Sequence, residues 1–379
     1  MKAMILSAGQ GTRLQPVTAN TPKSMVPLVG VRLLDRILDR LTEQGINQVA
    51  INSAHLSDEI TSHYGNGNQF GAEILHSFEG YRADGESFPQ PLGSAGGMMK
   101  IQQDHNFFDE TFIVLCGDAY FDIDLWAAVR EHITNRAVAT VIVKEMPDEK
   151  LANYGVVNYD PDGSVRSFQE KPAAADALSN KINTGIYIFQ KSIFDHIPKT
   201  GEFDIGSQLL PSLVEKGIKF YAHETTASWL DIGKIADLHE ATENVLKLKT
   251  KIRPSTKRFS HSVWLSESAA FDPTRVVCFG NLFVEAGSKI ETNAVFEGTC
   301  SVGKNCVVRR AAKLTRTLIT GSFVEIPSGV HLVDKIVTDD LVIALDGSSV
   351  SHEQAGLLDV RRLPKGVVAI NTNEKTATK

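Results

Sequence analysis

Residues 1–27, MKAMILSAGQGTRLQPVTANTPKSMVP, decide the fold expected of this chain. The apolar run KAMILS predicts a buried β-strand, and the pair Gly9 and Gly11 follows it directly. Glycines allow backbone angles at which successive N–H groups turn toward one anion. Arg13 adds a planar guanidinium that suits phosphate oxygens, and Lys23 adds a second, more compact positive charge. A strand, a glycine turn and two cations together predict a triphosphate-binding site.

The composition is that of an ordinary globular protein with room for two domains. The chain has 379 residues, of which 42% are hydrophobic and 22% are charged. The net charge of −6 argues against general nucleic-acid binding, so cations that bind polyphosphate must be placed locally. No apolar run approaches the ~18 residues of a membrane span, and the N-terminal run is too short for a secretion signal. We therefore expect no membrane partner.

The four cysteines show no metal-binding pattern. None belongs to a Cys-x-x-Cys pair, and no histidine spacing completes a zinc site. Reduced thiols are the simpler interpretation, and they are typical of a cytoplasmic protein. The cysteines are Cys116, Cys278, Cys300 and Cys306.

Apolar runs and helical patterns alternate beyond the opening stretch. Residues 33–44 (LLDRILDRLTEQ) repeat leucine or isoleucine at helical spacing, whereas residues 112–116 (FIVLC) and 139–143 have the composition of buried strands. Alternating strands and helices predict an α/β fold with a mostly parallel sheet covered on both faces. Ligands bind such sheets beyond the carboxyl ends of the strands, and the opening glycine turn lies at one of those ends.

Two further segments carry residues that suit a nucleotide site. Residues 93–97 (GSAGG) precede a predicted helix over 98–103, and small residues there would let backbone groups approach a flat base and ribose. A simple loop and helix start is the alternative. Asp118 follows the predicted strand that ends at Cys116, which suits a carboxylate that holds Mg²⁺ on a phosphate. A turn aspartate is the alternative there.

The opening string resembles the signature of the sugar-1-phosphate nucleotidyltransferases. That resemblance covers residues 1–248 densely and 277–342 loosely. It implies a Rossmann-like nucleotidyltransferase domain that joins a nucleoside triphosphate to a sugar 1-phosphate and releases pyrophosphate. The matching residues are Gly9, Gly11, Thr12, Arg13, Leu14, Pro16, Thr18, Pro22 and Lys23.

The resemblance also implies roles for single residues around the nucleotide. It makes Arg13 and Lys23 the catalytic cations, and it implies one Mg²⁺ bound by Asp118 and by Asp231 of a Trp-x-Asp-Ile-Gly motif. Residues 92–96 (LGSAG) are similar to the Leu-Gly-Thr-Ala-Gly loop of guanylyl members and lack the glutamine of thymidylyl members, which favours GTP. The implied nucleotide-binding residues are Leu6, Ala8, Gly9, Gly11, Thr12, Gly93, Ser94 and Ala95.

Three more motifs imply a sugar-phosphate site. Glu170 and Lys171 match the family's Glu-Lys-Pro motif, in which the glutamate binds sugar hydroxyls and the lysine binds the sugar's phosphate. Asn183 matches an asparagine that contacts the sugar, and Gly155 matches the glycine beside it. A solvated strand edge is the alternative for the Glu-Lys pair. A sugar requires a site of this kind because each hydroxyl needs a fixed partner.

Apolar residues recur every six positions in the last third of the chain. One series runs from Val284 to Leu314, and after a shift of four a second runs from Leu318 to Val342. This period predicts a hexapeptide solenoid and resembles the left-handed β-helix that follows many of these enzymes. His331 lies within the repeat, but about four predicted turns do not favour an acyltransferase site. We expect the repeat to support a homo-oligomer or regulation.

These patterns predict four segments. They are a nucleotidyltransferase domain over 1–248, a basic linker over 249–262, a left-handed β-helix over 263–344 and a tail of unknown structure over 345–379. The last residues, NTNEKTATK, have the composition of a frayed end.

The expected substrates are GTP and mannose 1-phosphate, and two alternatives stay open. The first is the same chemistry with UTP or dTTP and glucose 1-phosphate. The second is a non-catalytic regulatory subunit that senses a sugar nucleotide. Departures from the family pattern support this second alternative, because Ser24 replaces a usual proline and Val31-Arg32 replaces a usual Lys-Pro.

Overall fold

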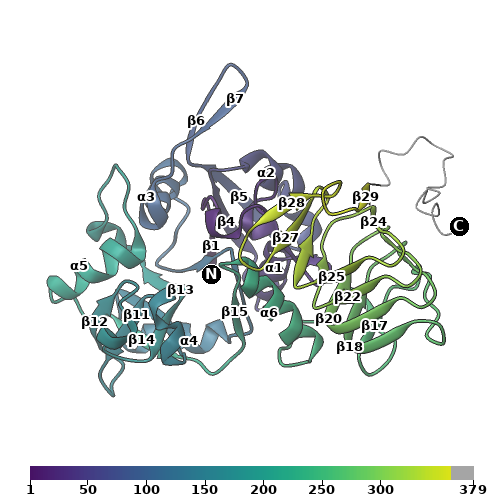
Figure 1. Ribbon diagram of the computed structural model, residues 1–379. Helices are drawn as coiled ribbons and strands as arrows, with labels where there is room; N and C mark the ends of the chain where they lie inside the picture. Colours follow the sequence, from purple (N-terminus) through teal and green to yellow (C-terminus); the bar gives the residue numbers. More distant parts are fainter. Residues whose placement is uncertain (360–379) are drawn as a thin grey trace, which may run out of the picture. The chain divides into compact units, whose positions relative to one another are not determined.

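Strand β1 (Lys2–Ser7) lies in the middle of a mixed nine-stranded sheet (Figure 1). The computed structural model describes residues 1–359. Met4 and Ile5 are both fully buried, but they belong to different apolar cores. They therefore face opposite sides of the sheet. Strands buried on both faces have continuous apolar sequences, which is why KAMILS predicted one.

The sheet is parallel around β1 and antiparallel farther along. Its strands are β1, β4 (Gln48–Ser53), β5 (Glu73–Phe78), β8 (Thr111–Cys116), β10 (Ala139–Glu145), β11 (Val156–Tyr159), β12 (Val165–Gln169), β13 (Lys181–Gln190) and β14 (Tyr221–Glu224). Strands β5, β4, β1 and β8 are neighbours in that order and all parallel. Strand β13 runs antiparallel to both β8 and β10. The predicted α/β fold with a mixed sheet is confirmed.

Shorter strand pairs extend this unit. They are β2 (Pro27–Leu28) with β3 (Val31–Arg32), β6 (Gly80–Ala83) with β7 (Glu86–Pro89), and β9 (Ala119–Phe121) with β15 (Trp229–Asp231). The β6–β7 hairpin extends away from the sheet (Figure 1). The β9–β15 pair matters most for the chemistry, because it joins segments that are distant in the sequence.

Helices cover both faces of the sheet. They are α1 (Leu33–Glu43), α2 (Ser57–Tyr64), α3 (Gly93–His105), α4 (Leu125–Thr134) and α5 (Leu210–Glu215), which a π-helical turn (Ile205–Leu209) precedes; α6 (Ile235–Leu246) follows them in the chain. Helix α1 shows the cause of this packing, because Leu34, Ile37, Leu38 and Leu41 recur on one face and are all fully buried. Helix α1 begins at Leu33, the residue at which the helical spacing of leucine and isoleucine predicted its start.

Helix α3 begins earlier than the sequence predicts. The glycine segment 93–97 was expected to be a loop before a helix from Met98, but it forms the first turns of α3. Glycine lowers the local helix propensity, so the sequence period begins only at Met98. The backbone oxygen of Phe203 accepts hydrogen bonds from the N–H groups of Ala95 and Gly96, both at 2.9 Å. This tertiary contact stabilises the first turn.

The chain divides into two compact units inside α6. The first is Met1–Asp237, and the second begins at Leu238, ahead of the predicted domain boundary at residue 248. Within residues 1–359, no helix is long and apolar enough to cross a membrane.

The second unit consists of short strands stacked mainly in parallel. They are β16 (Lys257–Arg258), β17 (Val263–Leu265), β18 (Val277–Val284), β19 (Lys289–Ile290), β20 (Val295–Val302), β21 (Val307–Val308), β22 (Lys313–Thr315), β23 (Leu318–Ile319), β24 (Val324–Ile326), β25 (His331–Val333), β26 (Lys335–Val337), β27 (Leu341–Ala344), β28 (Ser349–Ser351) and β29 (Leu358–Asp359). Val277 pairs with Val295, Val295 with Lys313, and Lys313 with His331, a constant register of 18 residues. Such a register fits a coil of three six-residue faces.

The six-residue period has its expected structural cause. Val284, Phe296, Val302, Val308 and Leu314 are all fully buried in one core. The parallel stack agrees with the predicted β-helix, whose handedness stays a prediction. Strand β16 lies within the predicted linker, and β28 and β29 lie within the predicted tail. The prediction of a frayed end falls on residues outside those described.

Candidate active site

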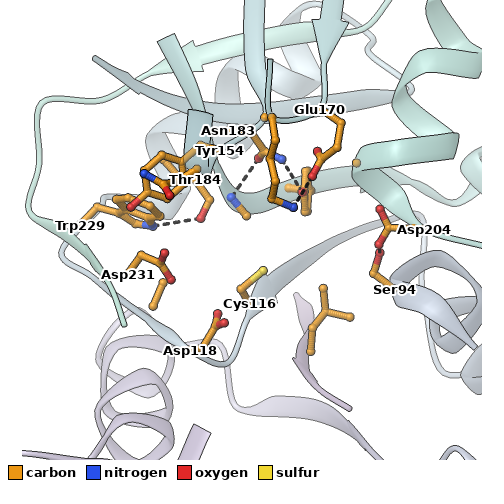
Figure 2. Close-up of a pocket in the computed structure, with 18 of the residues that line it drawn as sticks. Ser94, Cys116, Asp118, Tyr154, Glu170, Asn183, Thr184, Asp204, Trp229 and Asp231 are labelled. Carbon is orange, nitrogen blue, oxygen red and sulfur yellow. Dashed lines mark hydrogen bonds and ion pairs between the residues drawn. The ribbon is translucent and has the colours of Figure 1, made fainter. Parts of the chain in front are cut away.

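A cavity of about 210 Å³ lies at the carboxyl ends of β1 and β8 (Figure 2). Leu6 from the end of β1 and Cys116 from the end of β8 line its floor, and Asp118 follows two residues later. Parallel strands bring their carboxyl ends to the same edge of a sheet, so the location is the one that the opening sequence predicts.

Two acids from distant parts of the chain face this cavity together. Strand β15 pairs with β9 so that Asp231 lies opposite Ala119, and the N–H group of Ile232 donates to the backbone oxygen of Asp118 at 3.1 Å. Asp118 and Asp231 therefore point into the same space (Figure 2). Burial, reinforced by the negative charge of Asp118, raises the pKa of Asp231 to about 7. The pair is a strong site for a positive charge.

Lys23 supplies one such charge. Its ammonium forms an ion pair with the carboxylate of Asp118, and only 13% of its side chain is exposed. Burial lowers the pKa of Lys23, but the charges of Asp118 and Asp231 outweigh burial and hold this pKa above its ordinary value. Lys23 is thus a fixed cation beside the two acids.

The glycine turn after β1 places Lys23. Gly11 has a φ of +66°, which a side chain would rarely adopt, and a Cβ there would lie 3.2 Å from Cβ of Lys23. The hydroxyl of Thr18 donates to the backbone oxygen of Gly11 at 2.8 Å and closes the turn. Within residues 1–359, the N–H groups of Gly9 and Gly11 have no partner in the chain. Unpaired N–H groups beside cations are suited to an anion.

The first turn of α3 forms another wall of the cavity. The hydroxyl of Ser94 donates to Asp204 at 2.7 Å and accepts from the N–H group of Ile205 at 2.7 Å (Figure 2). Ser94 lines the cavity, whereas Gly93 and Ala95 lie beside it without lining it. The N–H group of Ala95 is already bound to Phe203, as described above.

Glu170 and Lys171 lie at the opposite wall. They form an ion pair of 2.6 Å with each other. A Cβ on Gly155 would lie 3.3 Å from a carboxylate oxygen of Glu170, and one on Gly206 would lie 3.1 Å from it. Two glycines therefore leave the space in which Glu170 lies.

Asn183 is held in a fixed orientation beside this pair. Its amide nitrogen donates to the hydroxyl of Tyr187 at 2.7 Å, and its amide oxygen accepts from the N–H group of Gly185 at 2.9 Å. The N–H group of Asn183 donates to the backbone oxygen of Gly155 at 2.8 Å, so two residues of different motifs are adjacent.

The structure brings most of the residues singled out in the sequence to this cavity. Lys23 does not line the cavity itself but forms an ion pair with Asp118, which does. The other residues of the glycine turn lie nearby without lining it, and the role of each residue stays a prediction. The residues that line it are Leu6, Arg13, Ser94, Asp118, Gly155, Glu170, Lys171, Asn183 and Asp231, and those that do not are Ala8, Gly9, Gly11, Thr12, Lys23, Gly93 and Ala95.

Sequence reasoning missed several residues of the cavity. Asp204 is the most notable, because hydrogen bonds from the N–H group of Ser207 and the hydroxyl of Ser94 outweigh burial and hold its pKa below the ordinary value. An acid directly before an apolar helical run is a usual N-cap, so its sequence carried no sign of a site. Cys116 also lines the cavity, but burial raises the pKa of its thiol, which argues against a thiolate nucleophile.

The donor set can be tested for a metal. Among the described residues, no group of three or more histidine, cysteine, aspartate or glutamate side chains converges on one point. Of the four acids that line the cavity, Asp118 and Asp231 are the two that the β9–β15 pair brings together. Mg²⁺ is commonly held by one or two carboxylates together with substrate phosphates, so the pair fits this ion when a phosphate is also bound.

Comparison with known proteins adds to this geometry. Residues 2–248 match the nucleotidyl transferase family. A UTP–glucose-1-phosphate uridylyltransferase from Synechocystis sp. is 38% identical over 358 residues, which are 94% of this chain and 92% of that protein. A mannose-1-phosphate guanylyltransferase from Mycobacterium tuberculosis is 26% identical over 316 residues, 81% of this chain and 83% of that protein.

A solved structure shows a similar fold. The crystal structure of HddC from Yersinia pseudotuberculosis, complexed with GMP-PN, is 26% identical and has a TM-score of 0.53. The match covers 64% of this chain and 98% of that one.

Proposed function

The chain belongs to the nucleotidyl transferase family and is a sugar-1-phosphate nucleotidyltransferase, and we propose that its substrates are UTP and glucose 1-phosphate. The observation that carries the proposal is the full-length similarity to a uridylyltransferase, at 38% identity against 26% for the guanylyltransferase. The expectation of GTP and mannose 1-phosphate rested on residues 92–96. It is the weaker candidate, because that segment lines the cavity through Ser94 alone.

The reaction requires no covalent intermediate. A phosphate oxygen of the sugar 1-phosphate attacks the α-phosphorus of the triphosphate. The bond from that phosphorus to the β-phosphate oxygen breaks, and pyrophosphate leaves. Because the attacking phosphate is ionised at neutral pH, no side chain has to remove a proton from it. Catalysis then depends on alignment and on neutralising charge.

Two cations are placed to neutralise the leaving pyrophosphate. Arg13 lines the cavity, and Lys23 lies beside Asp118 at its edge. The N–H groups of Gly9 and Gly11, which have no partner within residues 1–359, would bind phosphate oxygens. These groups would bind the β- and γ-phosphates more tightly as negative charge develops on them.

The opposite wall would hold the sugar 1-phosphate. Lys171 is half exposed and can turn from Glu170 to a phosphate. Glu170 offers carboxylate oxygens that can accept from sugar hydroxyls. Asn183, whose amide is held by hydrogen bonds with Tyr187 and Gly185, offers an acceptor and a donor. Asp204, which accepts from Ser94, adds a carboxylate whose pKa hydrogen bonds hold below its ordinary value despite burial. A polar site of this kind rejects a sugar that lacks one of the matching hydroxyls.

We further propose that Asp118 and Asp231 hold Mg²⁺ together with the triphosphate. Such an ion would neutralise phosphate charge at the reacting end of the nucleotide. The close approach of two carboxylates at the cavity supports this assignment.

A substrate matrix tests the proposal. Pyrophosphate release is measured with UTP, dTTP, GTP and ATP, each against glucose 1-phosphate and mannose 1-phosphate, with and without Mg²⁺. We expect kcat/KM for UTP with glucose 1-phosphate to exceed that of other pairs by about a hundredfold. A preference for GTP with mannose 1-phosphate would restore the earlier expectation. Binding of a sugar nucleotide with no turnover in any pair would instead favour the regulatory subunit.

A further inference from the structure

The phosphate turn after β1 (residues 8–13) follows Ser7, whose backbone N–H group is bound by the buried side-chain amide of Asn52. The N–H group of Ser7, the last residue of β1, donates to the side-chain oxygen of Asn52 at 2.9 Å. Asn52 lies on the neighbouring strand β4 and is 2% exposed. This bond fixes the orientation of the Asn52 amide, whose nitrogen must then point away from β1.

A buried carboxylate accepts from that nitrogen. Asn52 donates to one oxygen of Glu79 at 2.6 Å, and the N–H group of Leu92 donates to the other oxygen at 2.8 Å. Glu79 follows β5 directly and is 1% exposed. Leu92 is the residue before α3, so this chain of bonds runs from the start of the phosphate turn to the start of the first α3 turn.

The carboxylate also sets how closely α3 can approach. A Cβ on Gly97 would lie 2.2 Å from the carboxylate oxygen of Glu79 that Asn52 contacts, and 3.0 Å from the amide nitrogen of Asn52. Gly97 faces this link, whereas Gly96 packs on the backbone of residues 201–203. Gly97, the third glycine of the segment, is therefore explained by Glu79 and needs no contact with a nucleotide.

A contribution to stability is a weak explanation for a buried carboxylate at position 79. Burial raises the pKa of Glu79, and hydrogen bonds from Leu92 and Asn52 offset part of this effect. An apolar side chain at a buried strand end avoids the desolvation that a carboxylate must overcome. What a carboxylate adds is directional: it fixes the Asn52 amide, which holds Ser7, relative to the N–H group of Leu92 before α3.

We infer that Asn52 and Glu79 are positioning residues that set the separation between the phosphate turn and the first turn of α3, so that one triphosphate nucleotide contacts both. This inference rests on the proposed function and on the expectation from the sequence that residues 93–95 bind the same nucleotide as the phosphate turn. Neither residue lines the cavity, so each acts only through Ser7 or Leu92.

The chemistry of the link permits a reciprocal test. Glu79→Gln leaves an amide whose NH₂ group must face either the Asn52 amide or the Leu92 N–H, so one donor loses its acceptor. Asn52→Asp places two carboxylates against each other. The double variant N52D/E79Q restores every bond, because the aspartate accepts from Ser7 and from the new glutamine, whose oxygen accepts from Leu92.

The same two strands offer a matched control. Gln48 donates to Glu73 at 3.2 Å at the opposite, exposed ends of β4 and β5. Glu73→Gln therefore makes the same chemical change at the other end of β5, at a residue that does not line the cavity.

The experiment measures KM for the triphosphate, KM for the sugar 1-phosphate, kcat and the Kd of the triphosphate for all variants, with thermal unfolding in parallel. We expect each single variant to raise KM and Kd for the triphosphate about tenfold, with KM for the sugar 1-phosphate changed less than about twofold. The double variant should return within about twofold of wild type, and Glu73→Gln should match it.

The outcomes separate this inference from the proposed function. An active wild type whose single variants lose only thermal stability, or lose affinity for both substrates alike, overturns the inference and leaves the function standing. A wild type that binds the triphosphate without turnover overturns the function, and the Kd values then decide the inference. A wild type that neither binds nor turns over any triphosphate overturns both.

Discussion

Replacing Lys23 with alanine is the sharpest perturbation of the proposed chemistry. The Lys23 side chain is 13% exposed and pairs with Asp118, which is 30% exposed, so its charge is only partly screened by water. At an effective dielectric constant of about 20, two unit charges about 4 Å apart interact by about 4 kcal/mol. Part of this interaction with phosphate exists before reaction, which leaves about 3 kcal/mol for the transition state, or about a hundredfold in kcat.

The assay follows pyrophosphate release at saturating substrates, with thermal unfolding as a check of the fold. Losing a partly buried ion pair should cost about 1 kcal/mol, which lowers Tm by about 2–4 °C in a unit of this size. Lys247→Ala is the control, because Lys247 also pairs with a carboxylate, Glu243, but on the surface of α6. A Lys23→Ala enzyme that kept its kcat within threefold, with the control unchanged, would refute the assignment of Lys23 to the leaving pyrophosphate.

Two further predictions concern other parts of the first unit. In Gly155→Ala the new Cβ would lie 2.6 Å from the ring of Phe168 and 3.3 Å from Glu170. We therefore expect steady-state kinetics to show KM for the sugar 1-phosphate raised about tenfold and KM for the triphosphate changed less than about twofold. Equal changes in the two KM values would contradict the location of the sugar site. Burial lowers the pKa of His132 from 6.5 to about 4, so the unfolded chain takes up a proton at a higher pH than the folded one. Stability should be complete above pH ~6.5 and fall by up to about 3 kcal/mol as the pH drops to ~4, and urea unfolding of His132→Gln should show a flatter curve over that range.

The sequence predicted elements whose local and tertiary preferences agree. Strand β1 and helix α1 have apolar residues at the spacing that their own geometry buries, so each could be recognised alone. The start of α3 could not, because glycines at its first turn have poor helix propensity and a distant backbone oxygen, that of Phe203, stabilises it. An element that depends on a partner far away in the sequence carries no local signal.

Some residues of the candidate site could be recognised from the local sequence, and others could be recognised only from the folded chain. Arg13, Lys23 and Asp118 lie in short motifs, and the structure places them at one cavity. Asp204 was missed because its neighbours form an ordinary helix start, and only the folded chain brings it to Ser94. Asn52 and Glu79 were missed for another reason. They touch no ligand-facing surface, and their effect is visible only in bonds to the segments that do.

Two acids that line the cavity are each already paired with a lysine. Lys23 contacts Asp118, and Lys171 contacts Glu170. Each lysine has therefore given up part of its hydration before substrate arrives. If these lysines bind phosphate as we propose, binding would exchange one anionic partner for another, and the desolvation that usually offsets a new buried ion pair would be smaller. Glu170 would then become available to sugar hydroxyls as Lys171 turned to phosphate. Such an exchange would let a protein with net charge −6 bind two phosphorylated substrates in a cavity lined by several acids.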